Sequence, residues 1–371
     1  MTHSPPDEIA LDARDDAAAL AALGWGAAFE AAFQPFVEQG LIPARVVLEH
    51  KQRYRVATAR GEHSAEVSGR FRHLARSPHE FPAVGDWVAI RPSNGDSPAV
   101  IVAVLPRRSS FSRQAAGDRV QEQVVAANLD TVFVLMGLDG DFNPRRLERY
   151  LIAAWRSGAS PVVILNKADL ADDPSARLAL VHAVAPGVAV HLVSGRTGQG
   201  FEAVAAYLQQ GRTVGFLGSS GVGKSTLINR LLGRERQRVQ AVRDADSRGR
   251  HTTTHRELFV LQGGGLAIDT PGMLELQPWD AGESLTAAFD DIETLAQGCD
   301  FRDCQHQGEP DCAVEAAVAA GLLPAARLEN WRKLQREQRH QELRQDVQGR
   351  QRQKQQIRAV TGWYNREHGL E

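Results

Sequence analysis

The sequence predicts a multidomain protein with a small N-terminal β-barrel, a central α/β domain and a helical, metal-binding C-terminal domain. Short β-like runs broken by glycine and proline fill residues 41–106 after an N-terminal extension, residues 1–40. Apolar strands then alternate with helices over residues 113–278, and all three cysteines lie in the last segment, residues 279–371. A chain of 371 residues exceeds one ordinary core, which agrees with several domains.

The composition is that of a folded protein without a membrane anchor. Hydrophobic residues make up 43% of the chain and charged residues 24%, with a formal net charge of -2. Such a balance gives no overall attraction to nucleic acid, so any basic surface must be local. The acidic N-terminus lacks a secretory pattern, and no apolar run approaches the roughly 18 residues of a membrane span. The few, clustered cysteines indicate a reducing cytoplasm rather than a disulfide framework.

The N-terminal extension is rich in alanine, and we expect a helix or a partly disordered arm without chemistry of its own. The next segment contains five runs with strand-like patterns, separated by turn residues. These runs are ARVVLEH, RYRVATAR, HSAEVSG, DWVAIRP and AVIVAVLP. Five strands in so short a segment fit a closed barrel of the oligonucleotide-binding (OB) type.

The predicted barrel is also rich in basic residues. Few of them are offset by acidic neighbours, which favours contact with nucleic-acid phosphates over a domain used only for packing. The residues concerned are Arg45, Lys51, Arg53, Arg55, Arg60, Arg70, Arg72, Arg76 and Arg91.

Residues 107–129 are expected to form a polar connector, after which strands and helices alternate. DTVFVLMG, PVVILN, VAVHLVS and TVGFLG are predicted strands, and the segments between them are predicted helices. One of these helices, PRRLERYLIAAWRSG, begins with a proline in its first turn. Two more strands, RELFVLQ and GLAID, follow. Near-continuous apolar strands separated by helices indicate a parallel sheet covered on both faces.

The segment GSSGVGKS, residues 218–225, matches a phosphate-binding loop and stands between a predicted strand and a predicted helix. Its glycines allow a tight turn whose backbone N–H groups face an anion at the positively polarised start of a helix. We expect Lys224 to reach the β- and γ-phosphates and the Ser225 hydroxyl to bind Mg²⁺. The predicted phosphate-site residues are Gly218, Ser219, Ser220, Gly221, Val222, Gly223, Lys224, Ser225 and Thr226.

A second motif, AIDTPG, supplies the rest of a magnesium and γ-phosphate site. Asp269 ends an apolar strand and can hold Mg²⁺, usually through water, and the backbone N–H of Gly272 can sense a γ-phosphate. The polar segment GRHTTTH, residues 249–255, lies where a switch loop with a magnesium-binding threonine belongs. Thr252 and Thr253 are the candidates, and the sequence leaves open which threonine of the run binds the ion.

NKAD follows a buried strand and has the pattern of a guanine-reading loop. The carboxylate of Asp169 can accept two parallel N–H bonds from guanine N1 and the exocyclic amine, which adenine cannot offer. Asn166 can brace the loop and Lys167 can lie over the base. SGR, after the strand VAVHLV, fits the companion base-contacting loop. The predicted base-contacting residues are Asn166, Lys167, Ala168, Asp169, Ser194, Gly195 and Arg196.

The two nucleotide loops occur in an unusual order. In most GTP-binding domains the phosphate loop comes first and the base-reading loop last, but here NKAD precedes GSSGVGKS. Joining the ends of such a domain and cutting it between the second and third helical crossovers produces this order. Domain termini often lie close together, so a sheet tolerates the rearrangement. The central domain is therefore predicted to be a circularly permuted GTPase.

The segment CDFRDCQHQGEPDC is a predicted zinc site, with Cys299, Cys304, His306 and Cys312 as ligands. Three thiolates and one imidazole form a full tetrahedral set for Zn²⁺. A closed set indicates a structural ion, because a catalytic zinc keeps one position open. The tail that follows is rich in arginine and glutamine, and a solvated helix and an RNA-facing arm both stay open for it.

These motifs together resemble the ribosome-small-subunit-dependent GTPases, the family called RsgA, YjeQ or EngC. The resemblance covers residues 41–340, through the barrel, NKAD, GSSGVGKS, GRHTTT, DTPG and the zinc motif. It implies hydrolysis of GTP to GDP and phosphate, with GTP, Mg²⁺ and one structural Zn²⁺ per chain. It also implies a cytoplasmic factor, expected to be a monomer, that binds the 30S subunit and its 16S rRNA late in assembly and is stimulated by that subunit.

One position departs from the usual GTPase pattern. Many GTPases place a water-orienting glutamine directly after the glycine of DTPG, but here Met273 stands there and has no hydrogen bond to give. We therefore expect slow intrinsic hydrolysis, with His251 as the candidate catalytic residue. A loop histidine that only contacts RNA or solvent is the alternative. Two other functions stay open: a GTP-gated RNA-binding scaffold, and a permuted GTPase that serves a different ribonucleoprotein.

Overall fold

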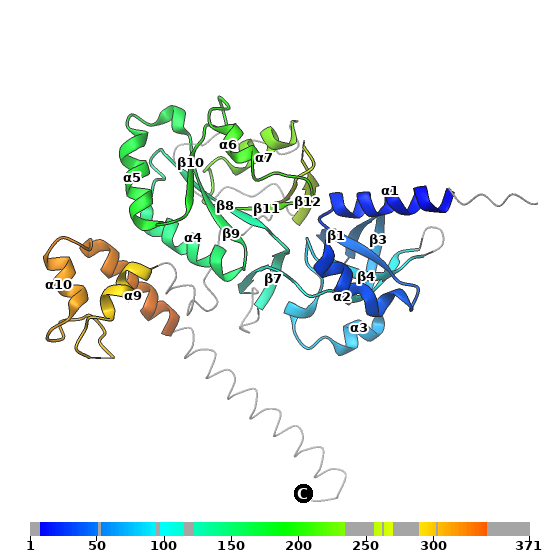
Figure 1. The fold of residues 1–371 in the computed structure, drawn as a ribbon, viewed down its shortest axis with the longest axis horizontal. Helices are drawn as coiled ribbons and strands as arrows, with labels where there is room; N and C mark the ends of the chain where they lie inside the picture. Colours follow the sequence, from blue (N-terminus) through cyan, green and yellow to red (C-terminus); the bar gives the residue numbers. More distant parts are fainter. Residues whose placement is uncertain are drawn as a thin grey trace, which may run out of the picture. The chain divides into compact units, whose positions relative to one another are not determined.

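A computed structural model gives the fold of the chain. It describes residues 8–50, 53–93, 97–114, 122–233, 256–261, 263–269, 289–301 and 303–339. The chain divides into two compact units, of which the first contains residues 1–113 and 122–277 and the second residues 114–121 and 278–371. The barrel and the α/β region belong to the first unit and the cysteine cluster to the second (Figure 1). No described helix is both long and apolar enough to cross a membrane.

The N-terminal helices pack on the barrel. Helices α1 (Glu8–Ala22) and α2 (Ala27–Val37) precede the first strand. The ring centroid of Trp25 lies 4.6 Å from that of Trp87 in the barrel, and the centroid of Phe29 lies 5.9 Å from it. Buried aromatic contacts of this kind contribute both apolar burial and a specific geometry. The described part of the alanine-rich segment is therefore a packed element of the first unit.

Five strands close into the predicted barrel. They are β1 (Ile42–His50), β2 (Arg53–Thr58), β3 (Gly61–Val67), β4 (Trp87–Arg91) and β5 (Ala99–Val104). Strand β1 pairs with β2 and β4, β3 pairs with β2 and β5, and β5 pairs with β4, so the ring is complete. Helix α3 (Gly69–Leu74) and the 3-10 turn η1 (Pro78–Glu80) connect β3 to β4.

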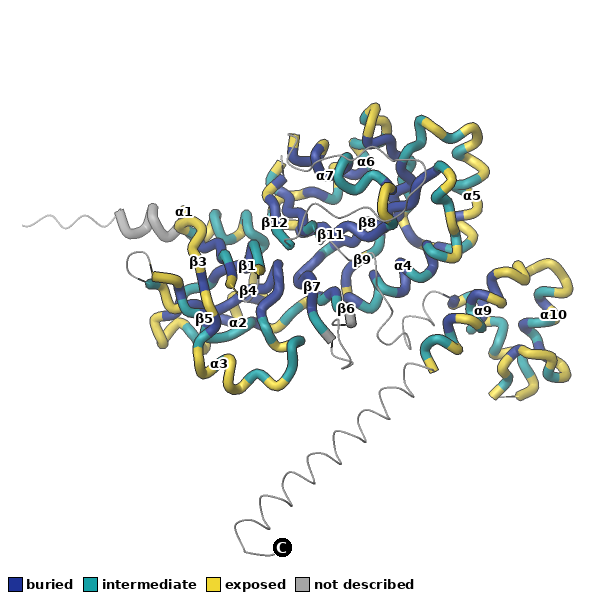
Figure 2. The backbone as a smooth tube through the Cα atoms, turned by 180° about the vertical axis from the view of Figure 1, so that it is seen from behind, coloured by how far each residue is buried: buried dark blue, intermediate teal, exposed yellow. Residues whose placement is uncertain are grey.

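The α/β region forms a mainly parallel sheet. Its strands are β8 (Thr131–Gly137), β9 (Ser160–Asn166), β10 (Ala189–Leu192), β11 (Thr213–Gly218), β12 (Arg256–Val260) and β13 (Leu266–Asp269). They lie in the order β10-β9-β8-β11-β13-β12, and β12 alone among them is antiparallel to its neighbour. The helices are α4 (Pro144–Arg156), α5 (Pro174–Val184), α6 (Phe201–Ala205) and α7 (Lys224–Leu232), and the 3-10 turn η2 is Ala168–Leu170. Strand β8 is buried along its whole length, as a strand covered on both faces should be (Figure 2).

The predicted polar connector is structured over part of its length. Strands β6 (Ser110–Gln114) and β7 (Glu122–Ala127) form a two-stranded sheet, and the apolar run VVAA of β7 is buried. The prediction of a plain connector over residues 107–129 is therefore wrong for these strands. The polar composition of the segment hides a short apolar run that packs against the α/β core.

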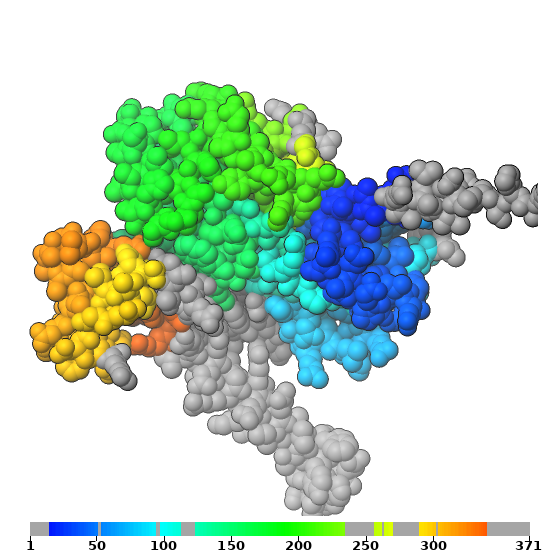
Figure 3. All heavy atoms as spheres, in the orientation of Figure 1, coloured from blue at the N-terminus to red at the C-terminus, as the bar shows by residue number. Residues whose placement is uncertain are grey.

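The barrel and the parallel sheet join into one eleven-stranded sheet. Strand β1 pairs antiparallel with β12, and Glu49 lies opposite Arg256. The blue atoms of the N-terminal part of this unit adjoin the green atoms of the α/β region (Figure 3). Two ion pairs reinforce this junction, Arg256 with Glu49 at 3.3 Å and Arg55 with Glu257 at 2.9 Å. Because Arg256 directly follows the predicted switch segment 249–255, the first described residue after that segment is held against the barrel.

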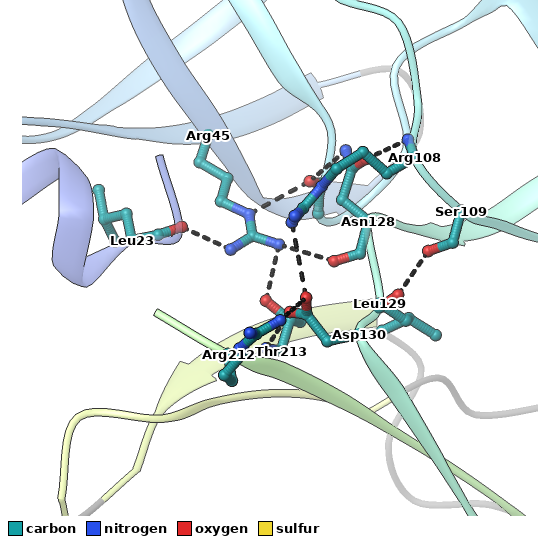
Figure 4. Close-up of polar contacts among 10 residues, drawn as sticks. Leu23, Arg45, Arg108, Ser109, Asn128, Leu129, Asp130, Arg212 and Thr213 are labelled. Atoms are coloured by element: carbon teal, nitrogen blue, oxygen red, sulfur yellow. Dashed lines mark hydrogen bonds and ion pairs between the residues drawn. The ribbon is translucent and has the colours of Figure 1, made fainter. Parts of the chain in front are cut away.

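Arg45 of β1 lies buried between the N-terminal helices, the barrel and the start of β11, which corrects the prediction that it contacts nucleic acid. The residue is only 1% exposed. Its guanidinium donates hydrogen bonds to the carbonyl oxygens of Leu23, Gly85 and Asn128 and to the hydroxyl of Thr213 (Figure 4). Burial lowers the pKa of Arg45 to about 10, so the side chain is still protonated at neutral pH. Arg45 thus ties the N-terminal helices and the barrel to the start of β11.

The second unit is small and helical. Helices α9 (Asp290–Ala296) and α10 (Ala313–Ala319) flank the cysteine cluster, and residues 325–339 form a further helix. A small core of this kind usually needs a metal ion or disulfides for stability. Its buried apolar residues, among those described, include Phe289, Ile292, Val314, Ala317, Leu323, Leu328 and Leu334.

Candidate functional site

The predicted nucleotide loops meet at one edge of the parallel sheet. Asn166 ends β9, Gly218 ends β11 and Asp269 ends β13, while the SGR loop follows β10. Parallel strands bring their carboxyl ends to the same edge, so segments far apart in the sequence converge there. A cavity of about 220 Å³ opens at this edge and is lined by Asn166, Lys167, Asp169, Leu170, Gly195, Arg196, Gly223 and Thr226. One cavity therefore contacts the base-reading loop, its companion loop and the phosphate loop.

Asn166 connects these loops. The residue is 2% exposed, and its amide nitrogen donates to the carbonyl oxygen of Val222 at 2.8 Å. Its amide oxygen accepts a hydrogen bond from the backbone N–H of Gly195 at 3.0 Å. Gly223 leaves room for this side chain, because a Cβ there would lie 2.3 Å from the Asn166 amide nitrogen. A φ of +98° at Gly223 also favours glycine.

The carboxylate of Asp169 receives donors on both oxygens. The Ser194 hydroxyl donates to Oδ1 at 2.6 Å, and Arg196 Nε donates to Oδ2 at 3.0 Å. These hydrogen bonds, that from Ser194 above all, hold the pKa of Asp169 below its usual value. The carboxylate is therefore ionised at neutral pH and suited to accept the N–H groups of a guanine edge.

Lys224 stands at the start of α7 with its ammonium group turned onto its own loop. Its Nζ donates to the carbonyl oxygens of Gly218 at 2.5 Å and Ser219 at 2.8 Å. Burial lowers the pKa of Lys224 to about 8, although the negative charges of Asp269 and Asp141 act in the opposite direction. A bound phosphate group would replace the carbonyl oxygens and favour the charged amine.

The structure describes the predicted magnesium site only in part. Ser225 lies in the first turn of α7, and Asp269 ends β13 close enough for its charge to act on Lys224. The remaining predicted residues, His251, Thr252, Thr253, Gly272 and Met273, lie outside the described residues. Their roles therefore stay predictions.

Two side chains that belong to no motif hold the loops in place. Arg230 of α7 donates to the backbone carbonyl oxygens of residues 195–197 at 3.2 to 3.3 Å, which ties the SGR loop to the helix after the phosphate loop. Asp139, in the loop after β8, accepts a hydrogen bond from Lys167 Nζ at 2.6 Å. The sequence gives no signal for either, since Arg230 resembles any surface helix cation and Asp139 any loop acid.

The four predicted zinc ligands converge in the second unit. All four ligand atoms lie within 4.8 Å of one another. His306 Nδ1 lies 3.7, 3.3 and 3.4 Å from the sulfur atoms of Cys299, Cys304 and Cys312, and the sulfurs of Cys299 and Cys312 are 3.9 Å apart. Zinc bonds of about 2.0–2.3 Å in a tetrahedron place ligand atoms roughly 3.4–3.8 Å apart. The cluster could therefore hold a zinc ion.

A basic surface lies on and directly after α3. Arg70, Arg72 and Arg76 are exposed there, and they form no ion pair with the described residues. We refer to these three residues as the α3 patch. Unpaired, exposed arginines are well suited to phosphate groups, because the planar guanidinium can donate two parallel hydrogen bonds.

The other basic residues predicted on the barrel differ in their surroundings. Arg53 and Arg91 are exposed on β2 and β4. Arg55 pairs with acidic side chains of β3 and β12, and Arg60 pairs with an acidic side chain of α1. Lys51 lies outside the described residues. The α3 patch is therefore the densest group of exposed barrel arginines without acidic partners in the described part of the chain.

Comparisons with known proteins agree with this geometry. The family model for the RsgA GTPase matches residues 104–279. The chain is 49% identical to a small ribosomal subunit biogenesis GTPase RsgA from Opitutus terrae, over 88% of this chain and 92% of that protein. It is 43% identical to the protein of the same name from Streptomyces coelicolor, over 90% of both.

Two solved structures are also similar to this chain. The crystal structure of YjeQ from Thermotoga maritima matches with a TM-score of 0.61 at 27% identity, over 80% of this chain and 98% of that one. The crystal structure of YloQ, a circularly permuted GTPase, matches with a TM-score of 0.59 at 25% identity, over 81% of this chain and 96% of that one.

Proposed function

Because the chain belongs to the RsgA GTPase family, we propose that it hydrolyses GTP at the described cavity and acts in assembly of the small ribosomal subunit. The relatives are named for biogenesis of that subunit, which supports this target. The observation that carries the nucleotide assignment is the cavity in which the base-reading loop, the SGR loop and the phosphate loop meet.

In this proposal the ionised Asp169 accepts both N–H groups of the guanine edge. Asn166 holds the base-reading loop to the phosphate loop, and Lys167 lies over the base. Arg196 has to release at least one carboxylate position when guanine enters, because it now donates to Oδ2. The shape of the cavity and the charge of Asp169 together select guanine.

The phosphate groups of GTP are proposed to bind to the loop from Gly218 to Lys224. Its backbone N–H groups face the phosphates, and Lys224 exchanges two carbonyl partners for phosphate oxygens. Ser225 and Asp269 would hold Mg²⁺, which supplies charge neutralisation for the transferred phosphoryl group when bound.

The catalytic step itself is proposed to depend on His251. With Met273 after DTPG, no glutamine is available at that position to orient water. If His251 acts in the transition state, His251→Ala should lower stimulated turnover by about 10²-fold, or about 2.7 kcal/mol. GTP affinity should be unchanged, because the lost interaction is made only in the transition state. Normal turnover in this variant would leave His251 as an RNA-contacting or solvated residue.

The partner is proposed to be the 30S subunit, contacted through 16S rRNA by the α3 patch. Phosphate contacts made by arginine are electrostatic, so they weaken steeply as salt is added. Deleting the barrel is a poor test of this contact. The deletion would remove the strand that pairs with β12 and the Arg45 side chain that ties the barrel to β11. Point substitutions on the patch avoid both problems.

The test is steady-state GTP hydrolysis with purified 30S or 50S subunits. We expect 30S subunits to stimulate the wild-type protein, and the triple variant Arg70→Gln, Arg72→Gln, Arg76→Gln to lose most of this stimulation. The matched Lys variant at the same positions keeps the charges and should retain much of it. Equal stimulation by 50S subunits, or none by 30S, would point to a different ribonucleoprotein. Binding of GTP without stimulated turnover would favour an RNA-binding scaffold.

A further inference from the structure

The order of the strands places one further loop between the two halves of the nucleotide site. Strand β8 pairs in parallel with β9 on one side and with β11 on the other. Gly137 at its end lies opposite Asn166, and Leu135 lies opposite Gly218. The segment that follows, residues 138–143, is therefore flanked by the base-reading loop and the phosphate loop. We call this segment the β8 loop.

The first acid of the β8 loop contacts the base-reading loop. Asp139 Oδ2 accepts a hydrogen bond from Lys167 Nζ at 2.6 Å, and both side chains are less than one-third exposed. Lys167 has a φ of +63°, a left-handed conformation that a lysine rarely adopts without support. Burial opposes the ionisation of Asp139, but the hydrogen bond from Lys167, the backbone hydrogen bonds within the loop and the charge of Lys167 together outweigh it and hold the pKa of Asp139 below its usual value.

The second acid of the β8 loop contacts the phosphate loop. Asp141 Oδ2 accepts a hydrogen bond from the hydroxyl of Ser219, the second residue of GSSGVGKS. Its other oxygen pairs with Arg146 of α4 at 2.7 Å, and Arg146 also donates to the Asp141 carbonyl oxygen. The charge of Asp141 acts on Lys224 as well. One short loop thus contacts both loops that a nucleotide would join.

The β8 loop is itself held in place by neighbouring elements. Arg177 of α5 donates to the carbonyl oxygens of Leu138 at 2.6 Å and Asp139 at 3.1 Å. The backbone N–H of Leu138 donates to the carbonyl oxygen of Asn166 at 2.8 Å. Gly137 precedes it, and a Cβ there would lie 2.5 Å from Asp139 Oδ1, so a larger residue would displace this carboxylate. Because the β8 loop is held by these contacts, it can hold Lys167 and Ser219 in defined positions.

We propose that Asp139 and Asp141 are positioning residues for the nucleotide site. Asp139 keeps Lys167 in the conformation that covers the base, and Asp141 keeps Ser219, and with it the phosphate loop, in a shape ready for phosphate. The inference rests on the proposed GTP site. Both acids act on a preformed binding surface, so they set nucleotide affinity and not the rate of the chemical step.

Substitutions at the two acids test this inference in the full-length protein. Asp139→Asn keeps the shape of the side chain but removes its charge, and we expect about tenfold weaker binding of both GDP and GTP, because a charged hydrogen bond is lost. Asp141→Ala should weaken both nucleotides by a few-fold. In both variants kcat at saturating GTP with 30S subunits should stay within about twofold of wild type while KM rises. Asp139→Glu restores the charge and should recover part of the affinity.

A double-mutant cycle shows whether Asp139 acts through Lys167. In the Lys167→Met background, Asp139→Asn should have little further effect on GDP affinity, since its partner is already absent. Additive effects would overturn the assignment of Asp139 as the support of Lys167. The thermal midpoint without nucleotide separates positioning from folding, and a fall in that midpoint that parallels the loss of affinity would make the residue merely structural. If the wild type binds no GTP, the proposed function fails. If the wild type binds and both variants bind equally well, only this inference fails.

Discussion

The cysteine–histidine cluster takes its four candidate ligands from residues 299–312, whereas the nucleotide site takes its residues from loops spread over residues 139–269. The cluster lies in the small second unit, between two short helices. The nucleotide loops instead lie on a sheet whose central strands are fully buried. A metal ion in the cluster would supply much of the stability of the small unit that binds it. The strands that carry the described nucleotide loops are packed without a nucleotide, so a nucleotide should add little to their stability.

This difference predicts opposite responses when each ligand is removed. Without metal, three thiols and an imidazole lose the ion that would join them, and the small apolar core around them is left to support the unit. Without nucleotide, the carboxylate of Asp169 and the amide of Asn166 keep their protein partners. The second unit should therefore lose its fold and the first unit should keep it.

The largest expected effect is that of zinc removal. Structural zinc contributes roughly 10–16 kcal/mol in small zinc domains, about as much as the whole stability of a typical domain. Chelation, or Cys304→Ser, should abolish hydrogen-exchange protection in α9 and α10. Protection in β8 and β11 of the same sample serves as the control and should persist. Purified protein without zinc by metal analysis, or protected helices after chelation, would contradict this comparison.

The second effect concerns guanine recognition. Asp169→Asn replaces a carboxylate that accepts two N–H groups with an amide that offers one acceptor and one donor. Discrimination between GTP and other nucleotides should fall by about 10⁴-fold, because a purpose-built hydrogen-bonding site is left unpaired. Xanthosine triphosphate, whose carbonyl can accept from the new amide, should bind this variant better than GTP does.

The fold of the Asp169 variant is the control for this measurement. Among the described residues, the side-chain hydrogen bonds of Asp169 are with Ser194 and Arg196, near the cavity, so the thermal midpoint of the first unit should move little. Equal affinity of the wild type for ATP and GTP would show that this carboxylate does not read the base.

The same contrast explains what could be predicted from the sequence. The cysteine–histidine cluster could be predicted because its four ligands lie close together in the sequence with a spacing typical of zinc sites. The nucleotide loops could be read because each is a local motif at a strand end. Arg45 could not be placed, because the sequence pattern of a strand is the same whether its arginine faces solvent or is buried. Here the side chain is buried and donates to three carbonyl oxygens and one hydroxyl. Asp139 and Arg230 were not singled out either, because their partners are distant in the sequence.

The third prediction uses the pH dependence of nucleotide binding. Lys224 has a pKa of about 8 without nucleotide, lowered by burial, and phosphate should raise it. Binding then takes up a proton, so affinity is full below about pH 7 and falls as the pH rises above 8. Between pH 7 and pH 9 we expect a loss of about tenfold in GDP affinity, since one pKa unit corresponds to a factor of ten.

Lys224→Arg is the matched control for that titration. A guanidinium stays charged throughout this range, so whatever its absolute affinity, the variant should lack the added pH dependence. Titration of the nucleotide itself would affect both proteins equally, so it cancels when the GDP affinity of the wild type is divided by that of the variant at each pH. Parallel pH profiles for the two proteins would show that Lys224 is already fully charged in the free protein.

The smallest expected effect tests whether Arg196 competes with guanine for the carboxylate of Asp169. Arg196 now donates to the Asp169 oxygen that guanine needs, and its guanidinium presents the same planar pair of N–H donors as the guanine edge. The Arg196 side chain is 76% exposed, so this pair should contribute only a fraction of a kcal/mol. Arg196→Ala should therefore bind GDP about threefold more tightly than the wild type and release it more slowly. The difference between the two proteins should be larger at low salt, because less screening leaves the competing Arg196–Asp169 pair stronger. Arg196→Lys, which keeps the charge without the planar donors, should lie between the two. Weaker binding in Arg196→Ala would mean that the arginine turns to contact the nucleotide itself, as the sequence motif predicts, and that the base site rearranges on binding.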